Sequence, residues 1–262
     1  MEQQALFGLA ALARTRLDKP QGILYQPKGR AREYSDWACN LYTGCEHACT
    51  YCYVVRSLGR NEQGFVSHVS PRTGILAKLE SDAAYFQGMG MAQQVLLSFT
   101  HDPYQPVEAD YQVTRQAIQI LHKHGMGVCT LSKGGSLATR DLDLFGPQDA
   151  YAATLTFLDS ARSKEWEPGA ALPEDRLATL KAFHQAGIRT WVSCEPVFDP
   201  AETLRIIETT RGYVDHYKIG TLNHHEAALH TDWHSFARQA KNLCERLGLS
   251  YYLKADLRAY LR

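Results

Sequence analysis

The chain has 262 residues, an isoelectric point near 7.2, and 28 Lys plus Arg balanced by 28 Asp plus Glu. This length allows one large α/β domain or two small ones, and a hydrophobic fraction of 45% with 21% charged residues is typical of a globular protein. The balanced charge gives no general reason to expect a polyanionic partner, and no stretch approaches the roughly 20 apolar residues of a membrane-spanning helix.

The N-terminal region differs from the rest of the chain in composition. An apolar run near its start follows Glu2 rather than basic residues, which argues against a secretory signal peptide. The region then gathers cations, with few acids besides Asp18. Two interpretations stay open: an arm that contacts phosphates, and a solvated arm packed on the outside of the fold. We predict a basic extension at residues 1–36 ahead of a single domain at residues 37–262; the cations are Arg14, Arg16, Lys19, Lys28, Arg30 and Arg32.

Three cysteines follow the first predicted strand, "DWACNLY". The loop "NLYTGCEHACTYCYV" places Cys45, Cys49 and Cys52 at the spacing Cys-x3-Cys-x2-Cys. A structural zinc site usually has four ligands, and the fourth here would be His47, between two of the cysteines. An iron–sulfur cubane normally takes four thiolates, so three would leave one iron open for chemistry. Tyr51 supplies a flat aromatic face beside the last cysteine.

The whole cysteine set indicates reduced thiols. An odd, clustered set in a chain of this length is not typical of a disulfide framework, which needs paired cysteines and an oxidising compartment. We therefore predict a cytoplasmic protein. The seven cysteines are Cys39, Cys45, Cys49, Cys52, Cys129, Cys194 and Cys244.

After residue 90 the chain alternates strand-like and helix-like segments. The helix expected at residues 173–187 has Pro173 at a favourable first position and Gly187 as a stop. Repeated units of this spacing predict a parallel sheet. Together with the first strand, they predict an α/β fold of six parallel strands, a partial (βα)6 TIM-type barrel with an N-terminal extension. The strands are expected within residues 93–100, 126–132, 151–158, 188–198 and 214–222, and the helices within residues 110–125, 173–187, 200–212 and 232–248.

Polar residues gather where the predicted strands end. The carboxyl ends of parallel strands form the edge at which barrels and open α/β sheets bind ligands. We therefore expect a ligand site there, although loops are polar in general. The residues concerned are Thr100, His101 and Asp102; Ser132 and Lys133; Thr156 and Asp159; Ser193 and Glu195; and Lys218 and Asn223.

The cysteine motif, with an aromatic residue before its last cysteine, resembles the signature of radical S-adenosylmethionine (radical SAM) enzymes. The resemblance extends over residues 28–262. The segments "SFTHDPYQPVE", "ARSKEWEPGA", "RLATLKAFHQAGIRTWVSCEPVFDP", "KIGTLNH" and "YYLKADL" are similar to the subgroup related to spore photoproduct lyase, a subgroup often labelled DNA repair photolyase-like.

The resemblance implies a cofactor site. Cys45, Cys49 and Cys52 would hold three irons of a 4Fe–4S cluster, and the fourth iron would bind the amino and carboxylate groups of SAM. Lys133 would pair with the SAM carboxylate, and Glu195 would accept hydrogen bonds from the ribose hydroxyls. Structural interpretations stay open for these two: Lys133 as a solvated loop residue, and Glu195 as a helix cap. The resemblance also places Tyr51 near the adenine, Thr156 near the end of SAM that Lys133 contacts, and Thr100, His101 and Asp102 where many relatives carry Gly-Gly-Glu.

The resemblance further implies an activity. One electron from the reduced cluster would cleave SAM and give a 5′-deoxyadenosyl radical, which abstracts hydrogen from an unactivated carbon; the cofactor owns this chemistry and the protein orients it. The implied electron source is an external donor of the flavodoxin or ferredoxin type. Repair or modification of nucleic acid is the leading hypothesis for the substrate. The same chemistry on a peptide or small metabolite is one alternative, and a zinc-stabilised nucleic-acid-binding module without catalysis is the other.

The sequence also departs from spore photoproduct lyase itself. That enzyme returns hydrogen to its product through a cysteine near the end of the second strand, whereas "LLSFTHDPY" contains none. Cys194 alternates with Ser193 and Glu195, so we expect it to point to the opposite side of its strand. Tyr42, Tyr53 and Tyr104 are the alternative hydrogen donors that the sequence offers near the predicted site.

Overall fold

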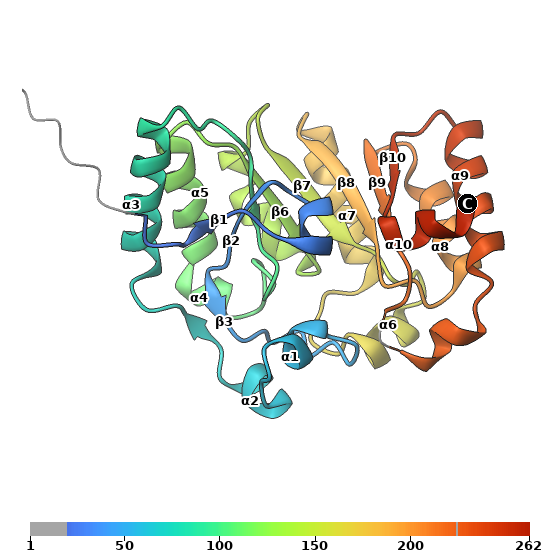
Figure 1. The fold of residues 1–262 in the computed structure, drawn as a ribbon. Coiled ribbons are helices and arrows are strands. Elements are labelled where there is room, and N and C mark those ends of the chain that lie inside the picture. The colour runs from blue at the N-terminus through green and yellow to red at the C-terminus, as the bar shows by residue number, and fades with distance from the viewer. Residues whose placement is uncertain (1–19, 224) are drawn as a thin grey trace, which may run out of the picture.

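The structure is a computed structural model that describes residues 20–223 and 225–262, and its main feature is one eight-stranded sheet (Figure 1). The strand order is β1-β2-β5-β6-β7-β8-β9-β10, and a small second sheet pairs β3 with β4. The strands are β1 (Leu24–Tyr25), β2 (Trp37–Cys39), β3 (Tyr42–Thr43), β4 (Ser70–Pro71), β5 (Val95–Leu97), β6 (Val128–Ser132), β7 (Ala150–Thr154), β8 (Arg189–Cys194), β9 (His216–Ile219) and β10 (Tyr251–Leu253).

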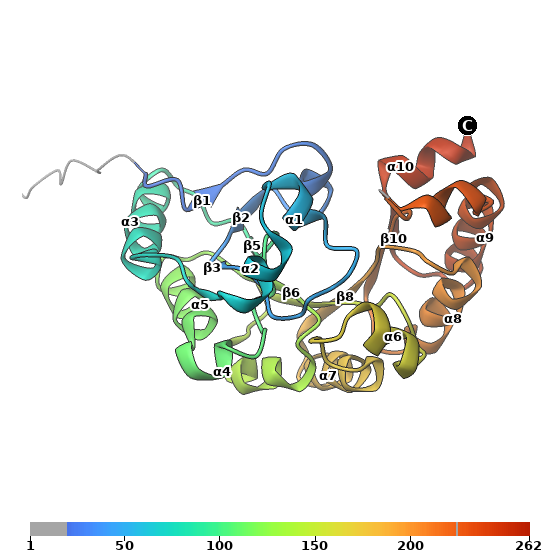
Figure 2. The same ribbon diagram turned by 90° about the horizontal axis from the view of Figure 1, so that it is seen from below.

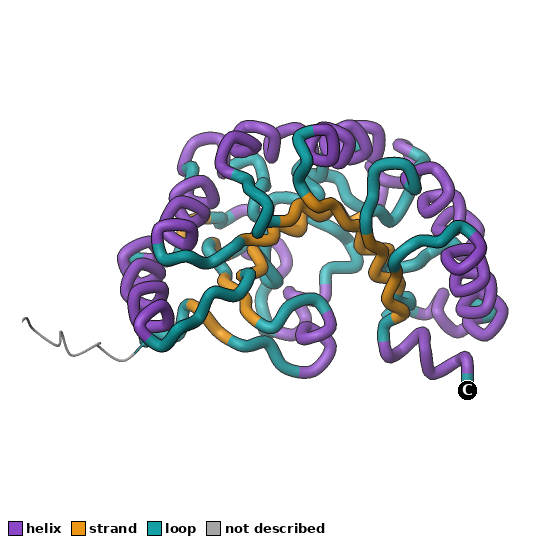
Figure 3. The backbone as a smooth tube through the Cα atoms, turned by 90° about the horizontal axis from the view of Figure 1, so that it is seen from above, coloured by secondary structure: helices purple, strands orange, loops and turns teal. Residues whose placement is uncertain are grey.

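The large sheet curves into an open arc with helices on its outer side (Figure 3). All strands from β2 to β10 in this sheet pair in parallel, whereas β1 pairs with β2 in antiparallel. The predicted α/β partial barrel of TIM type is therefore confirmed. The predicted number of parallel strands is wrong by one. The short run that follows the last predicted helix forms β10, because its backbone pairs with β9 from Tyr251 to Leu253.

The helices cover the arc in chain order, as strand–helix units require. Figure 2 shows α3, α5, α7, α8 and α9 following one another along its outer side, and Figure 1 places α1, α2 and α6 below the strands. The four predicted helices are confirmed as α5, α7, α8 and α9. The helices are α1 (Tyr53–Ser57), α2 (Glu62–Ser67), α3 (Ile75–Gly88), α4 (Glu108–Tyr111), α5 (Val113–Lys123), α6 (Ser160–Trp166), α7 (Pro173–Gln185), α8 (Pro200–Thr210), α9 (Trp233–Arg246) and α10 (Ala255–Arg258), with 3-10 turns η1 (Gly29–Glu33), η2 (Gly135–Leu144), η3 (Glu226–His230) and η4 (Ala259–Leu261). Among the described residues, no helix is both long and apolar enough to cross a membrane.

The two faces of the sheet are packed differently. Its outer face and the helices bury one large apolar core, which includes Leu97, Val192 and Ile219. The concave face carries a smaller cluster in which Ala150 and Ala152 of β7 leave little bulk. Successive side chains of a strand point to opposite faces, so the residues that line the inside of the arc alternate with core residues.

A segment before β2 crosses the open side of the arc. We call residues 26–36 the strap. Glu33 Oε1 accepts hydrogen bonds from the Tyr252 hydroxyl at 3.0 Å and from the Ala255 N–H at 2.7 Å. Lys218 of β9 donates to the carbonyls of Glu33 and Tyr34, both at 2.8 Å. The strap thus connects the first strands of the sheet with the last ones. The domain boundary expected at residue 36 stays a prediction.

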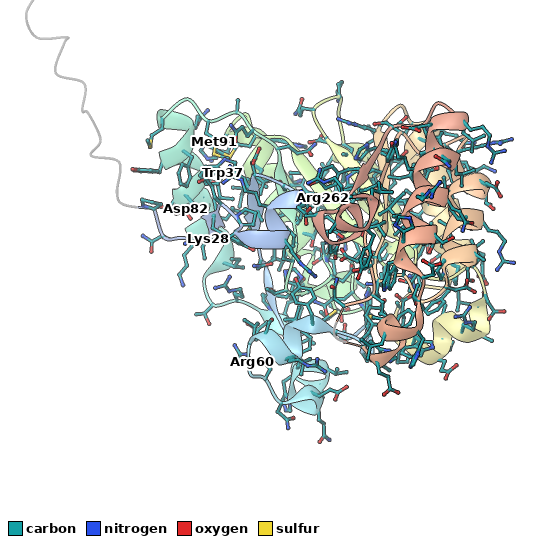
Figure 4. The ribbon with its side chains drawn as sticks, turned by 45° about the vertical axis from the view of Figure 1, so that its right-hand side comes forward. Lys28, Trp37, Arg60, Asp82, Met91 and Arg262 are labelled. Atoms are coloured by element: carbon teal, nitrogen blue, oxygen red, sulfur yellow. The ribbon has the colours of Figure 1, made fainter. Side chains whose placement is uncertain are left out.

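The start of the described chain is held by α3. Asp82, labelled in Figure 4, accepts hydrogen bonds from the backbone N–H groups of Ile23 at 2.7 Å and Leu24 at 3.0 Å. Asp82 is fully buried, so these bonds satisfy a carboxylate that burial would otherwise penalise. They fix β1 at the edge of the sheet, from which the strap begins.

Candidate functional site

A cavity of about 350 Å³ lies at the carboxyl ends of the parallel strands. This volume is within the range of small-molecule sites. The cysteine loop forms one wall, the strap forms another, and the ends of β5, β6, β7 and β8 form the floor. The polar or reactive lining residues used below are Arg30, Tyr34, Cys45, His47, Cys49, Tyr51, Cys52, Tyr53, Thr100, His101, Asp102, Lys133, Ser193, Glu195, Asn223 and Lys254.

All three cysteines of the motif line this cavity. They occupy the loop between β3 and α1, which begins at Gly44 with a φ of +83° that favours glycine. The loop is fixed at its first cysteine, since the Cys45 N–H donates to the Phe65 carbonyl at 3.0 Å. The sequence placed the three thiols close together, and the structure places them on a shared wall.

The donor set fits a multi-iron cluster. Burial raises the pKa of the Cys49 thiol to about 11, an effect that nearby Lys133 partly offsets, and burial likewise raises the pKa of Cys45. Metal coordination deprotonates such thiols outright. Within the described ranges, no three His, Cys, Asp or Glu side chains gather closely enough to share one metal ion. A cubane binds each thiolate to a different iron, so it does not need that convergence.

Tyr51 lies between the cysteine loop and a buried carboxylate. Its hydroxyl donates to Glu167 and lies 3.4 Å from Thr156 Oγ1. Its ring packs against Phe198 with centroids 5.4 Å apart, and the Lys133 ammonium lies 5.6 Å from the ring centroid. The aromatic ring predicted beside Cys52 is therefore part of the cavity wall, and Glu167 holds the hydroxyl of this tyrosine in place.

Lys133 lines the cavity with 18% of its side chain exposed. Burial opposes its charged form, but the neighbouring Cys49 thiol and Glu167 carboxylate outweigh burial and raise the pKa of Lys133. The ammonium lies 4.0 Å from Glu167 Oε1. This lysine is therefore not a solvated loop residue.

Thr156 lies outside the lining of the cavity. It is buried, and its hydroxyl donates to Glu167 Oε1 at 3.3 Å. The structure therefore places it one contact behind Tyr51. Direct contact between Thr156 and a bound cofactor stays a prediction.

The "THD" segment after β5 lines the cavity, but two of its three side chains already have protein partners. His101 Nε2 accepts a hydrogen bond from the Leu41 N–H at 2.7 Å. Asp102 accepts from the Ser132 hydroxyl and the Lys133 N–H, both at 2.6 Å. Both side chains therefore brace neighbouring strand ends, while Thr100 remains as a lining residue.

His47 does not turn toward a shared metal position with the cysteines. It is buried, and its Nδ1 lies 3.3 Å from Asp102 Oδ2. Burial alone would raise the pKa of Asp102, but the contact with His47 and the hydrogen bonds from Ser132 and Lys133 outweigh burial and lower that pKa.

Glu195 follows β8 and is held by three side chains. Its carboxylate accepts hydrogen bonds from the Tyr34 hydroxyl at 2.6 Å, from Asn223 Nδ2 at 3.2 Å and from the Lys254 ammonium. Gly220 leaves the room for this arrangement, since a Cβ there would lie 2.8 Å from Glu195 Cδ. Glu195 does not cap a helix; the Asp199 side chain caps α8 by accepting hydrogen bonds from its first N–H groups.

Three residues of this site were missed by the sequence reasoning: Tyr34, Glu167 and Lys254. Lys254 is 3% exposed and pairs with Glu195. It directly follows β10 in "YYLKADL". Because the sequence does not predict this strand, it does not indicate that Lys254 lies at a strand end. No periodicity or spacing signals the other two.

The remaining cysteines are buried away from the cavity. Cys194 belongs to the core while Ser193 and Glu195 line the cavity, as the alternation predicts. Cys129 lies on the concave face and accepts a hydrogen bond from Trp191 Nε1 at 3.1 Å. Cys39 and Cys244 are fully buried.

Of the three tyrosines considered as hydrogen donors, Tyr53 lines the cavity. It is 52% exposed, and its hydroxyl donates to the Phe99 carbonyl at 2.9 Å. Tyr42 donates to the buried Glu108, and Tyr104 is buried.

Two arginines in the described part of the basic extension pair with carboxylates. Arg30 lies 3.4 Å from Asp256 Oδ2, and Arg32 lies 3.5 Å from Asp36 Oδ1. Both arginine side chains remain more than half exposed. These pairs are what the solvated-arm interpretation predicts, and contact with phosphates stays a prediction. Arg14, Arg16 and Lys19 lie outside the described residues.

Comparison with known proteins places this site in a family. Residues 39–213 match the Radical SAM superfamily. An uncharacterised protein of Methanocaldococcus jannaschii is 25% identical over 71% of this chain and 70% of its own length. One of Acidianus two-tailed virus is 29% identical over 70% of this chain and 64% of its own length. One of Mycobacterium tuberculosis is 29% identical over 62% of this chain and 49% of its own length. The match thus spans about half of the mycobacterial relative.

Solved structures share the fold. A variant of spore photoproduct lyase has a TM-score of 0.69 at 12% identity, covering 87% of this chain and 79% of that one. Spore photoproduct lyase complexed with a dinucleoside spore photoproduct has a TM-score of 0.67 at 13% identity, covering 92% and 81%. Streptococcus suis SuiB bound to S-adenosylmethionine has a TM-score of 0.63 at 10% identity, covering 86% and 52%. Likenesses at this identity show the fold alone.

Proposed function

This chain belongs to the radical SAM superfamily and is therefore an enzyme that uses a 4Fe–4S cluster and SAM, and we propose that Cys45, Cys49 and Cys52 bind that cluster. One observation carries the proposal. The three thiols line the same cavity as Lys133 and Glu195, which are the side chains suited to the two polar ends of SAM.

The cluster, when bound and reduced, supplies the electron that cleaves the sulfonium C–S bond of SAM, and its own electron comes from an external donor of the flavodoxin or ferredoxin type. The chain supplies binding, orientation and exclusion of water. Its reduced thiols suit a cytoplasmic setting. The cavity walls formed by the strap and the cysteine loop enclose the reacting groups.

Each cofactor contact is assigned to a side chain of the cavity. Lys133 pairs with the SAM carboxylate, because it is a cation held in a partly buried position. Glu195 accepts hydrogen bonds from the ribose hydroxyls, since Lys254 and Tyr34 fix its carboxylate at the floor of the cavity. Tyr51 packs beside the adenine. Thr100 meets the amino group of SAM. His101 and Asp102 hold the neighbouring strand ends in place, and Thr156 lies behind Tyr51, where it donates to Glu167.

We propose nucleic acid as the substrate, to be repaired or modified. Spore photoproduct lyase, which has this fold, has been solved with a dinucleoside spore photoproduct bound. At the mouth of this cavity, Arg30 is exposed enough to meet a phosphate and Tyr53 is exposed enough to stack on a base. The pairing of Arg30 with Asp256 favours the alternative, in which the same chemistry acts on a peptide or small metabolite.

An anaerobic assay tests both the cleavage of SAM and the proposed nucleic-acid substrate. The reconstituted protein is reduced with dithionite in the presence of SAM, with and without UV-irradiated DNA, and 5′-deoxyadenosine is quantified. We expect 5′-deoxyadenosine from the unaltered protein and none from Cys49→Ala. We further expect irradiated DNA to raise the yield above that with unirradiated DNA. Equal yields with both DNAs would reject photodamaged DNA, and the absence of DNA and RNA binding would favour the peptide or metabolite alternative.

A further inference from the structure

A loop far from the cysteines in sequence packs directly against the cysteine loop. We call residues 166–171, between α6 and α7, the bracket. The Thr50 N–H donates to the Trp166 carbonyl at 3.0 Å, and the Gly169 N–H donates to the His47 carbonyl at 2.9 Å. The bracket also contacts the residue that follows β6, since the Ala171 N–H donates to the Lys133 carbonyl at 2.9 Å. One short loop therefore fixes both the cysteine loop and the backbone of Lys133.

The contact between bracket and cysteine loop is close. A Cβ at Gly169 would lie 2.1 Å from the Glu46 carbonyl oxygen and 3.0 Å from His47 Cα. These are backbone atoms, which cannot rotate away as the end of a side chain can. Glycine is therefore the residue that permits this approach.

Glu167 is the side chain through which the bracket reaches the cavity. It is 1% exposed, and its Oε1 accepts hydrogen bonds from Tyr51 and Thr156 and lies 4.0 Å from the Lys133 ammonium. Its Oε2 lies 2.6 Å from an amino group of the buried Arg176. One carboxylate thus contacts both Tyr51 and Lys133, the aromatic and the cationic side chain near Cys49.

A purely structural role for Glu167 would need only Arg176, since that pair already neutralises two buried charges. The geometry offers more than that pair. The Tyr51 hydroxyl and the Lys133 ammonium both approach Oε1, the oxygen that Arg176 leaves free. A carboxylate that only balanced a buried guanidinium would not need to direct its second oxygen at two cavity residues.

We propose that Glu167 is a positioning residue of the SAM site, which holds the Tyr51 ring and the Lys133 ammonium in the places where they meet the cofactor. The inference rests on the proposed function, in which Lys133 binds the carboxylate of SAM. Glu167 touches neither cluster nor SAM in this scheme and acts through its two partners. Its loss should therefore weaken SAM binding while the cluster still assembles.

The test compares four variants of the full chain, each reconstituted anaerobically: Glu167→Gln, Lys133→Met, their double variant, and Glu165→Gln as a matched control on an exposed neighbour. SAM binding is measured by calorimetry, iron by chemical assay, and the reduced cluster by its electron paramagnetic resonance (EPR) spectrum with and without SAM. We expect full iron content throughout and about tenfold weaker SAM binding in Glu167→Gln. We expect the double variant to bind SAM no more than about threefold more weakly than Lys133→Met, since only the part of the Glu167 effect that passes through Tyr51 remains once the ammonium is gone.

Two results would overturn the inference: SAM affinity of Glu167→Gln within twofold of the Glu165→Gln control, or losses in Glu167→Gln and Lys133→Met that multiply in the double variant. If Glu167→Gln does not fold, Glu167→Asp replaces it. That variant keeps the charge beside Arg176 but is one methylene too short to reach all its partners. Weaker SAM binding with full iron content supports the inference, and unaltered SAM binding overturns it. Failure of the proposed function is distinct, because the unaltered, iron-loaded protein would then show no EPR response to SAM, which overturns both.

Discussion

The Tyr34 hydroxyl donates a 2.6 Å hydrogen bond to Glu195 Oε2, although 161 positions separate the two residues. Tyr34 belongs to the strap and Glu195 follows β8, so this bond joins the segment that crosses the open side of the arc to the floor of the cavity. Lys254 holds the same carboxylate from the end of β10. Glu195 is therefore fixed by groups from opposite ends of the described chain.

Replacing Tyr34 by Phe should weaken SAM binding by several-fold, because Glu195 loses a charge-assisted hydrogen bond that orients it toward the ribose. The matched control is Tyr252→Phe, which removes another hydroxyl that anchors the strap but lies outside the cavity lining. Calorimetry should show unaltered SAM affinity in the control. Equal losses of SAM affinity in both variants would mean that the anchoring of the strap affects binding, and not the specific bond from Tyr34 to Glu195.

Alanine at Cys45, Cys49 or Cys52 should abolish iron binding and SAM cleavage, since a cubane with two protein thiolates is not retained. Alanine at Cys39 or Cys244 should leave the iron content nearly unaltered, because both thiols are buried away from the cavity. Iron assay and visible absorbance of anaerobically reconstituted protein measure this. Loss of the cluster in Cys39→Ala would show that the ligand assignment is wrong.

Lys133→Ala and Glu195→Ala should each weaken SAM binding by about 1.5–3 kcal/mol, roughly ten- to a hundredfold, with the absorbance of the cluster retained. The loss in Glu195→Ala includes an unpaired buried Lys254. The double change Glu195→Ala with Lys254→Met should therefore regain stability in thermal unfolding but not SAM affinity. SAM affinity that equals that of the unaltered protein in both single variants would remove the two residues from the site.

Acid should destabilise the protein partly through His101. Burial lowers the pKa of His101 from 6.5 to about 4, and the neutral ring accepts the Leu41 N–H. Between these two pH values the unfolded chain binds a proton that the folded chain does not, so the free energy of unfolding falls as pH falls. The contribution is about 1.4 kcal/mol per pH unit.

Denaturant unfolding of the cluster-free protein at pH 4 to 7 measures this slope. His101→Gln should lose that part of the pH dependence, whereas His68→Gln, at an exposed position, should keep it. An unaltered slope in His101→Gln would assign the acid sensitivity to other groups.

The basic extension gives a test that separates substrate classes. If it contacts phosphates, binding to duplex DNA should weaken with salt, and replacing Arg30 and Arg32 by Glu should flatten the log–log slope by about two units. Fluorescence anisotropy at several salt concentrations measures the slope. Should the arginines serve only their partners Asp256 and Asp36, the double variant would lose stability and keep its DNA affinity. Negligible binding of the unaltered protein at low salt would reject the nucleic-acid proposal.

The sequence was informative wherever function depends on local spacing. Cys45 to Cys52 share one loop, and Lys133 and Glu195 stand directly after runs that read as buried strands, so their convergence followed from the rule that parallel strands end at one edge. Glu167 could not be found in this way, because its contact with Tyr51 spans 116 positions and depends on how a helix connection folds back. Lys254 was missed because three residues of strand are too few to show an alternating pattern.

The strap has a consequence for the order in which the protein is made. Glu33 accepts a hydrogen bond from the N–H of Ala255, 222 positions later, and Glu195 needs Lys254 to complete its contacts. About 200 residues separate the cysteine loop from Lys254, and synthesis at about 5–20 residues per second takes roughly 10–40 s to cover them. During that time the three thiols have left the ribosome while the walls that enclose them do not yet exist. Long-range closure of this kind is slow in folding, so the three thiols stay unenclosed until the last strand is in place.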